Sequence, residues 1–319
     1  MIFNWQKLEK PFTALAPMDD VTDTVFRQII AGCAKPDVMF TEFVNVEGLN
    51  SIGKNKLMSK LKFDKCERPI IAQIWGKIPE NYYKVTQMIV KLGFDGVDIN
   101  MGCPVKVVVK NGCGSAHIDN PKLAGEIIQA VREGVASTGN NIPVSVKTRI
   151  GTKRIVTEDW ISFLLEQKLD AIIIHGRTQL EMSKVPVHWV EIGKAVKMRD
   201  KMKINTVIIG NGDVTTIKEV QKKAKEYGVD GVMIGRGIFN DMYIFSKKLK
   251  VYSKKEKINL LIKHLNIYKK TYGENGRFKV LKKYFKIYIS GFDGASEIRT
   301  RLMETKNIEE ARSVIKEID

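Results

Sequence analysis

A cysteine follows an apolar run in the stretch Gly96-Val97-Asp98-Ile99-Asn100-Met101-Gly102-Cys103-Pro104. The β-branched residues of this run indicate a strand, Gly102 permits a tight turn, and Pro104 cannot continue a hydrogen-bonded ladder. Cys103 is therefore expected at the carboxyl end of a strand, which is the catalytic face if the fold is a parallel α/β barrel. The alternative is a small buried cysteine in a turn, because free cysteine is among the most buried residue types.

Other polar side chains also stand at or near the ends of apolar runs, and these are Gln73, Asn100, Lys147, Arg149, His175 and Arg177. Lys147 interrupts an apolar run, and a lysine there needs a partner or an anion because burying a bare charge is costly. His175 follows three isoleucines, where a satisfied core histidine is the alternative. Together, Gln73, Asn100 and His175 are suited to hydrogen-bonding a flat heterocycle.

Two glycine-containing turns, Asn211-Gly212-Asp213 and Gly235-Arg236-Gly237, follow the last two apolar runs of this kind. Turns at these positions of a barrel, each leading into a helix, bind phosphate through backbone N–H groups and the helix dipole. Arg236 adds a guanidinium donor. Plain tight turns are the alternative. A phosphorylated heterocycle such as FMN would satisfy both these turns and the polar strand ends.

Eight short apolar runs must position these residues, and their period predicts strands buried on both faces. They cover 12–16, 37–43, 69–75, 96–101, 143–148, 170–175, 206–210 and 230–234. Amphipathic helices are expected between them, among them 81–92, 121–135 and 158–167, with Thr22 or Asp23 capping an earlier one. Eight strand–helix repeats predict an α/β fold, a (β/α)8 TIM barrel.

After position 244 the alternation of strand and helix patterns ends, and only helical patterns follow. Helices are expected over 255–272, 277–290, 296–304 and 308–318, with glycine-containing breaks between them. We therefore expect a catalytic barrel over 1–244 and a small, basic, all-helical C-terminal domain over 245–319.

Charge indicates a polyanionic partner. The 319 residues carry a formal net charge of +17, and 245–319 alone hold 19 Lys and Arg against 9 Asp and Glu. A surplus of this size favours nucleic acid. A membrane surface or a lysine-rich genome is the alternative explanation.

Composition argues against several other classes. The four cysteines form no C-x-x-C pair, which argues against zinc and against a disulfide framework, so no metal is expected. No apolar run approaches the roughly 18 residues of a membrane span, and the N-terminal residues do not have the pattern of a signal peptide. We expect a cytoplasmic monomer that does not bind membranes.

Taken in order, several motifs resemble those of the tRNA-dihydrouridine synthases. They are Ala16-Pro17-Met18-Asp19-Asp20-Val21-Thr22-Asp23, Thr41-Glu42-Phe43-Val44, Asp98-Ile99-Asn100-Met101-Gly102-Cys103-Pro104, Val146-Lys147-Thr148-Arg149, His175-Gly176-Arg177-Thr178, Asn211-Gly212-Asp213 and Gly235-Arg236-Gly237. In the C-terminal part, Tyr284-Phe285-Lys286 through Gly291-Phe292 and Ala295-Ser296-Glu297-Ile298-Arg299 resemble the tRNA-binding domain of that family.

This resemblance implies an FMN cofactor across the barrel mouth and NADPH as the reductant. Residues implied to flank or bond the flavin ring are Pro17, Met18, Asp19, Gln73, Lys147 and His175. Residues implied to hold the ribityl chain and phosphate are Asn211, Gly212, Asp213, Gly235 and Arg236. Cys103 would deliver the proton to C5 of a uracil whose C6 receives the hydride, so its thiol must stay neutral.

The resemblance also implies a tRNA substrate, with the reduced uridine in the D-loop and flipped into the pocket. Residues expected to contact it are Asn100, Lys106, Arg149, Arg177, Arg277, Lys282 and Lys286. Two stretches depart from the family pattern: Asp19-Asp20 is an acidic pair, and Glu181-Met182-Ser183-Lys184 replaces an aromatic–glycine pair. A flavin barrel acting on a free pyrimidine and a non-catalytic RNA-binding barrel are the alternative functions.

Overall fold

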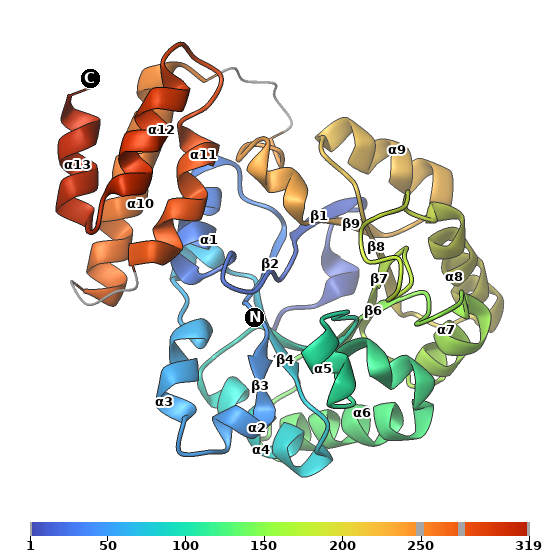
Figure 1. Cartoon of the computed structure of the whole chain (residues 1–319). Helices are drawn as coiled ribbons and strands as arrows, with labels where there is room; N and C mark the ends of the chain where they lie inside the picture. Colours follow the sequence, from blue (N-terminus) through green and yellow to red (C-terminus); the bar gives the residue numbers. More distant parts are fainter. Residues whose placement is uncertain (1, 247–251, 274–277, 318–319) are drawn as a thin grey trace.

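The computed structural model describes residues 2–246, 252–273 and 278–317. Its parallel sheet has the strand order β2-β1-β9-β8-β7-β6-β5-β4-β3, and a further pairing of β2 with β4 closes eight of the strands into a barrel (Figure 1). The TIM barrel predicted from the sequence is confirmed. The strands are β1 (Phe12–Leu15), β2 (Val38–Phe40), β3 (Val44–Asn45), β4 (Ile70–Trp75), β5 (Gly96–Met101), β6 (Val144–Arg149), β7 (Ala171–His175), β8 (Val207–Asn211) and β9 (Gly231–Ile234).

Alternate residues of each strand face different surroundings, as the two-residue period of a strand requires. In β1, Phe12 and Ala14 pack with Trp5 and Phe40 in one buried cluster, whereas Leu15 belongs to the larger cluster shared with the helices. The smaller cluster fills the barrel interior. Toward the carboxyl ends of the strands, the same inward positions change from apolar to polar residues, and this change creates the site.

Helices surround the barrel (Figure 1). The long ones are α1 (Thr24–Cys33), α4 (Pro79–Lys91), α6 (Pro121–Ala136), α7 (Thr157–Glu166), α8 (Trp189–Met202) and α9 (Ile217–Tyr227). Asp23 caps α1 by accepting a hydrogen bond from the Phe26 backbone N–H at 2.8 Å, as the sequence predicted. Three short helices lie in the connections: α2 (Val46–Leu49), α3 (Lys54–Leu57) and α5 (Lys106–Lys110).

The C-terminal part contains α10 (Lys254–Tyr272), α11 (Phe285–Tyr288), α12 (Ala295–Glu304) and α13 (Ile308–Lys316). The continuous helix expected over 277–290 is wrong, because a 3₁₀ segment covers Phe278–Tyr284 and a single α-turn follows it. Its buried residues explain the difference. Phe278, Leu281 and Tyr284 recur every three residues, which is the period of a 3₁₀ helix.

The C-terminal helices pack against α1 at one side of the barrel (Figure 1). Tyr284 stacks on Phe26 with ring centroids 5.0 Å apart, and its hydroxyl donates to the Val21 carbonyl. Tyr272 donates to the Asp23 carboxylate at 3.5 Å. No helix among the described residues is long and apolar enough to cross a membrane.

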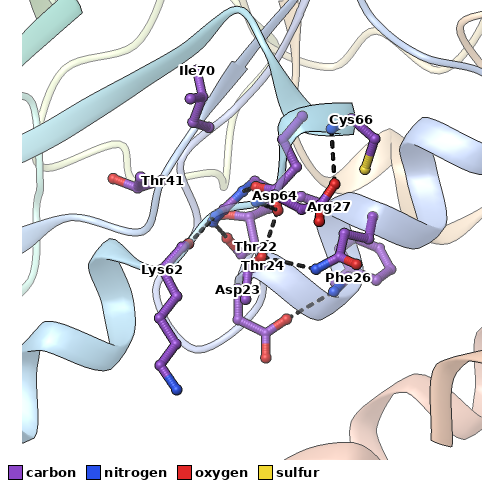
Figure 2. Close-up of polar contacts among 12 residues, drawn as sticks. Thr22, Asp23, Thr24, Phe26, Arg27, Thr41, Lys62, Asp64, Cys66 and Ile70 are labelled. Atoms are coloured by element: carbon purple, nitrogen blue, oxygen red, sulfur yellow. Dashed lines mark hydrogen bonds and ion pairs between the residues drawn. The ribbon is translucent and has the colours of Figure 1, made fainter. Parts of the chain in front are cut away.

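A fully buried ion pair fixes the start of α1 on which those helices pack (Figure 2). Arg27 Nε donates to Glu67 Oε2 at 2.6 Å, and the rest of its guanidinium donates to the carbonyls of Thr22 and Lys62. Glu67 in turn accepts from the Thr24 hydroxyl and from the Asp64 backbone N–H. Both charges are thus paired and hydrogen-bonded, which is the condition under which buried charges are tolerated.

Replacing Arg27 by methionine is predicted to lower the free energy of unfolding by about 3–5 kcal/mol, because Glu67 is left buried without its partner. The double variant Arg27→Met/Glu67→Leu removes both charges and should regain most of that loss. Urea denaturation measures both values. The exposed pair Arg301–Glu317 provides the control, since Arg301→Met should cost less than about 1 kcal/mol. Equal costs for the buried and exposed arginines would contradict this account.

Candidate active site

A cavity of about 570 Å³ opens at the carboxyl ends of the strands, from β6 round to β1. Most of the residues predicted to bind a cofactor line it, and these are Pro17, Met18, Lys147, His175, Asn211, Gly212, Asp213, Gly235 and Arg236. Sequence reasoning missed several further lining residues, among them Thr215, Met233, Phe239 and Asn240. Phe239 and Asn240 lie two and three residues after Gly237, so their closeness in sequence to the Gly235–Gly237 turn could have predicted that they line the cavity.

The two glycine turns form one wall. Gly212 has φ +135°, and a Cβ there would lie 2.6 Å from the Val187 side chain, so only glycine fits this turn. Gly235 places backbone beside Ala16 and Met18, with 3.6 Å from an ideal Cβ to Ala16. Arg236 is 65% exposed and lies 3.6 Å from Asp213. The guanidinium of Arg236 and the backbone of the two glycine turns therefore lie together in this wall of the cavity.

The helix-dipole part of the phosphate prediction is not confirmed. The turn after β9 leads into a 3₁₀ segment, Arg236–Phe239, instead of an α-helix. After β8, the start of α9 is closed by a capping box in which Thr216 and Glu219 bond each other's backbone N–H groups. A phosphate at this wall would therefore have to be bound by Arg236 and the backbone of the two turns, without a helix N-terminus.

Lys147 and His175 lie on neighbouring strands and face the cavity. Lys147 Nζ donates to Asn211 Oδ1 at 3.2 Å, and burial lowers the pKa of Lys147 to about 8. Burial and the nearby cations lower the pKa of His175 well below its ordinary value, so the ring is neutral. Arg177 can only donate to His175 Nε2, 3.3 Å away, which places the ring proton on Nδ1.

A buried polar network lies beneath this layer. Gln73 Nε2 and Ser145 Oγ both donate to the Asp98 carboxylate at 2.6 Å, and Asn100 Nδ2 donates to Gln73 Oε1 at 3.0 Å. Burial raises the pKa of Asp98 to about 6. Gln73 is fully buried and is not a lining residue, so it lies deeper than its predicted role requires. Every second residue of a strand faces the same side, so Asp98 points inward with Asn100, and Ser145 with Lys147. This alternation could have predicted the network from the sequence.

Cys103 is held at the end of β5 by its backbone. Asn100 Oδ1 accepts from the N–H groups of Gly102 at 3.1 Å and Cys103 at 2.9 Å, and Ser115 donates twice to the Cys103 carbonyl. The side chain packs with Val108 and Cys113. Burial raises the pKa of the Cys103 thiol above its ordinary value, so it is neutral at physiological pH. All four cysteines carry free thiols.

Asp19 is not among the residues that line the cavity, although Met18 before it is, and its side chain forms an ion pair with Lys60. Lys60 Nζ also lies 3.4 Å from Glu42 and 3.8 Å from Asp20, so the acidic pair noted in the sequence serves to hold this lysine. The structure therefore does not place Asp19 beside a cofactor in this cavity.

The predicted tRNA contacts have different surroundings. Lys106 and Lys286 are exposed, while Lys282 is half-buried and donates to the Met303 carbonyl at 2.5 Å. Arg149 and Arg177 are only 6% and 3% exposed, which differs from the surface role expected of them. Arg177 bonds the Asp213 carboxylate and the Val185 carbonyl. Arg277 lies outside the described residues.

Comparison with known structures supports the fold. The 2-naphthoyl-CoA reductase complex aligns with a TM-score of 0.54 at 12% identity, covering 73% of this chain and 49% of that one. Histamine dehydrogenase from Rhizobium sp. 4-9 aligns with a TM-score of 0.53 at 11% identity, covering 73% and 44%. At these identities the likeness concerns the barrel alone.

Sequence comparison is more specific. The family model described as dihydrouridine synthase matches residues 14–318. The probable tRNA-dihydrouridine synthase 2 of Bacillus subtilis (strain 168) is 43% identical over 318 residues, 99% of this chain and 96% of that protein. A probable tRNA-dihydrouridine synthase of Staphylococcus epidermidis (strain ATCC 35984) is 44% identical over 315 residues, 98% of this chain and 94% of that protein. The chain belongs to the dihydrouridine synthase family.

Proposed function

We propose that this protein binds FMN in the cavity at the barrel mouth and, with NADPH as the reductant, reduces uridines of tRNA to dihydrouridine. The proposal rests on a neutral thiol, Cys103, which directly follows the turn after β5 and interacts electrostatically with Lys147, a residue that lines the cavity together with His175 and Asn211. Cys103 is not itself one of the lining residues. The family membership established above supports a flavin-dependent oxidoreductase acting on tRNA.

The donors of the cavity suit a phosphorylated, electron-accepting ring. Lys147 and His175 are lining residues that would bond the flavin ring, and Arg236, also a lining residue, would bond the phosphate through its guanidinium. The glycines of both turns leave room for backbone to approach a phosphate. Bound FMN would supply, once reduced, the hydride that adds to C6 of the uracil.

The residues of this chain would complete the reaction. Cys103, as a neutral acid, would donate a proton to C5, which requires a protonated group within reach of that carbon. Asn100 and Ser115 would keep its backbone fixed through the four bonds described above. Lys147 would hold positive charge near the reduced ring. The D-loop position of the uridine, the cytoplasmic location, the monomeric state and the absence of a metal stay predictions.

Replacing Cys103 by alanine is predicted to leave reduction of the flavin by NADPH unchanged and to slow its reoxidation by tRNA about 10²–10⁴-fold, the usual effect of losing a positioned acid. Stopped-flow absorbance of the flavin follows both half-reactions. Cys66→Ala, at an exposed cysteine, is the matched control and should behave as wild type. Wild-type reoxidation in Cys103→Ala would remove this thiol from the mechanism, and reoxidation by free uridine alone would favour a free-pyrimidine enzyme.

FMN affinity is predicted to be constant below about pH 8 and to fall above it, because protonated Lys147, with its pKa of about 8, donates a stronger, charge-assisted hydrogen bond to the flavin ring than the neutral amine does. Phosphate stays dianionic over the measured range, from about pH 7 to about pH 9. Lys147→Met should bind FMN more weakly and lose this dependence. Flavin fluorescence titration measures the affinity, with the exposed Lys110→Met as the control. The same pH dependence in Lys147→Met would exclude Lys147 as its source.

The basic C-terminal helices are proposed to hold the tRNA backbone. Lys286→Glu, at an exposed position on α11, should weaken tRNA binding and reduce the slope of log Kd against log salt by about one. Lys197→Glu, at an exposed lysine on α8 around the barrel, makes the same charge change and should have a smaller effect. Filter binding at several salt concentrations compares the two. Equal effects would mean that binding depends on net charge alone.

A further inference from the structure

Arg149 joins two segments of the barrel mouth. It ends β6, its side chain is almost fully buried, and its Nε donates to the Gly102 carbonyl at 2.8 Å. Its Nη1 donates to the carbonyls of Thr178 at 3.0 Å and Met182 at 3.1 Å. Gly102 directly precedes Cys103, and the other two carbonyls belong to the connection between β7 and α8. One guanidinium thus links the cysteine turn to the β7–α8 loop, residues 176–188.

The cysteine turn leaves little freedom on its other sides. An ideal Cβ on Gly102 would lie 3.1–3.2 Å from backbone atoms of Thr148, so the turn already touches β6. Asn100 holds its two N–H groups. Ser115 holds the Cys103 carbonyl through two hydrogen bonds, and Arg149 holds the Gly102 carbonyl. A shift of this guanidinium therefore changes where the Cys103 side chain lies relative to the cavity.

The β7–α8 loop is organised mainly by its own contacts. Glu181 accepts from the Thr178 N–H at 2.7 Å and contacts His188 at 2.9 Å. The loop also donates from Gln179 and Leu180 to the Gly151 and Thr152 carbonyls. This is the loop in which the sequence departs from the family pattern. Because these contacts hold the loop in place, the carbonyls of Thr178 and Met182 have fixed positions. The two hydrogen bonds that they accept then fix the guanidinium of Arg149.

A small set of charged groups acts on Cys103 and Arg149. Arg149, Lys147 and Asp19 act on Cys103, and Arg177 and Glu181 act on Arg149. Burial is the main cause of the raised pKa of the Cys103 thiol, and the positive charge of Arg149 opposes it. Removing that charge should raise the pKa further, because the thiolate loses a stabilising cation.

We propose that Arg149 is a positioning residue for Cys103: it fixes the Gly102–Cys103 turn against the β7–α8 loop and so places the thiol for proton donation. This inference rests on the proposed function. It replaces the expectation that Arg149 binds a tRNA phosphate, since three of its five N–H groups donate to backbone carbonyls and the residue is almost fully buried.

Two variants separate geometry from charge. Arg149→Lys keeps the positive charge but cannot bond three carbonyls in the same way. It should lower kcat for tRNA about 10²-fold, as a misplacement of about 1 Å does, with tRNA Kd and its salt slope unchanged. Arg149→Gln should lower kcat similarly. Arg132→Lys on α6, at an arginine that donates to the Lys168 carbonyl, is the matched control and should retain wild-type kcat.

Alkylation of Cys103 by iodoacetamide gives a readout that needs no tRNA. The rate at the Cys103 peptide is followed by mass spectrometry against pH in the FMN-loaded protein. Arg149→Gln should move the midpoint of this profile to higher pH, whereas Arg149→Lys should keep it near that of wild type. A destabilised fold alone would expose the thiol in both variants and would not separate their midpoints.

Unchanged kcat with weaker tRNA binding and a salt slope lowered by about one would identify Arg149 as a phosphate ligand and overturn the proposal. Identical alkylation midpoints in wild type and Arg149→Gln would also overturn it. If wild type reduces its flavin with NADPH but never acts on tRNA, the proposed function fails. The alkylation midpoints then still decide whether Arg149 acts on Cys103.

Discussion

The two-residue period of the barrel strands is the constraint on which the site depends. It places Gln73, Asp98, Asn100, Lys147 and His175 on the inward face, where the lower half of the barrel is filled by apolar side chains. Polar groups there must bond one another or a ligand, because an unpaired buried polar group is costly. The lower ones satisfy each other. Lys147 and His175, higher up, line the cavity, where their side chains could meet a ligand.

Burial of the turn after β5 explains why the thiol is suited to proton donation. A cysteine that acts as a nucleophile needs a lowered pKa, whereas a proton donor needs a neutral thiol. Burial keeps Cys103 neutral despite the nearby cations of Arg149 and Lys147. The anchoring of its backbone by Asn100 and Ser115 then supplies position without adding charge.

Much of this was predictable from the sequence, for a physical reason. Strands buried on both faces are continuous apolar runs, so the eight barrel strands and the polar residues at their ends were visible. The two-residue strand β3 was missed because it is too short to show a period. The 3₁₀ segment at Phe278–Tyr284 was read as α-helix because spacings of three and four overlap. The partners of Arg149, Arg177 and Asp19 lie on distant loops, and sequence spacing does not show such contacts.

The central claim is that this chain makes dihydrouridine in tRNA and that Cys103 supplies one of the two added hydrogens. The most direct measurement is mass spectrometry of nucleosides digested from an unmodified tRNA transcript after incubation with the protein, FMN and NADPH. The account predicts uridine heavier by two hydrogen atoms with wild type, and little or none with Cys103→Ala. A yellow, NADPH-reducible protein that leaves every uridine of native and transcribed tRNA at its original mass would contradict it.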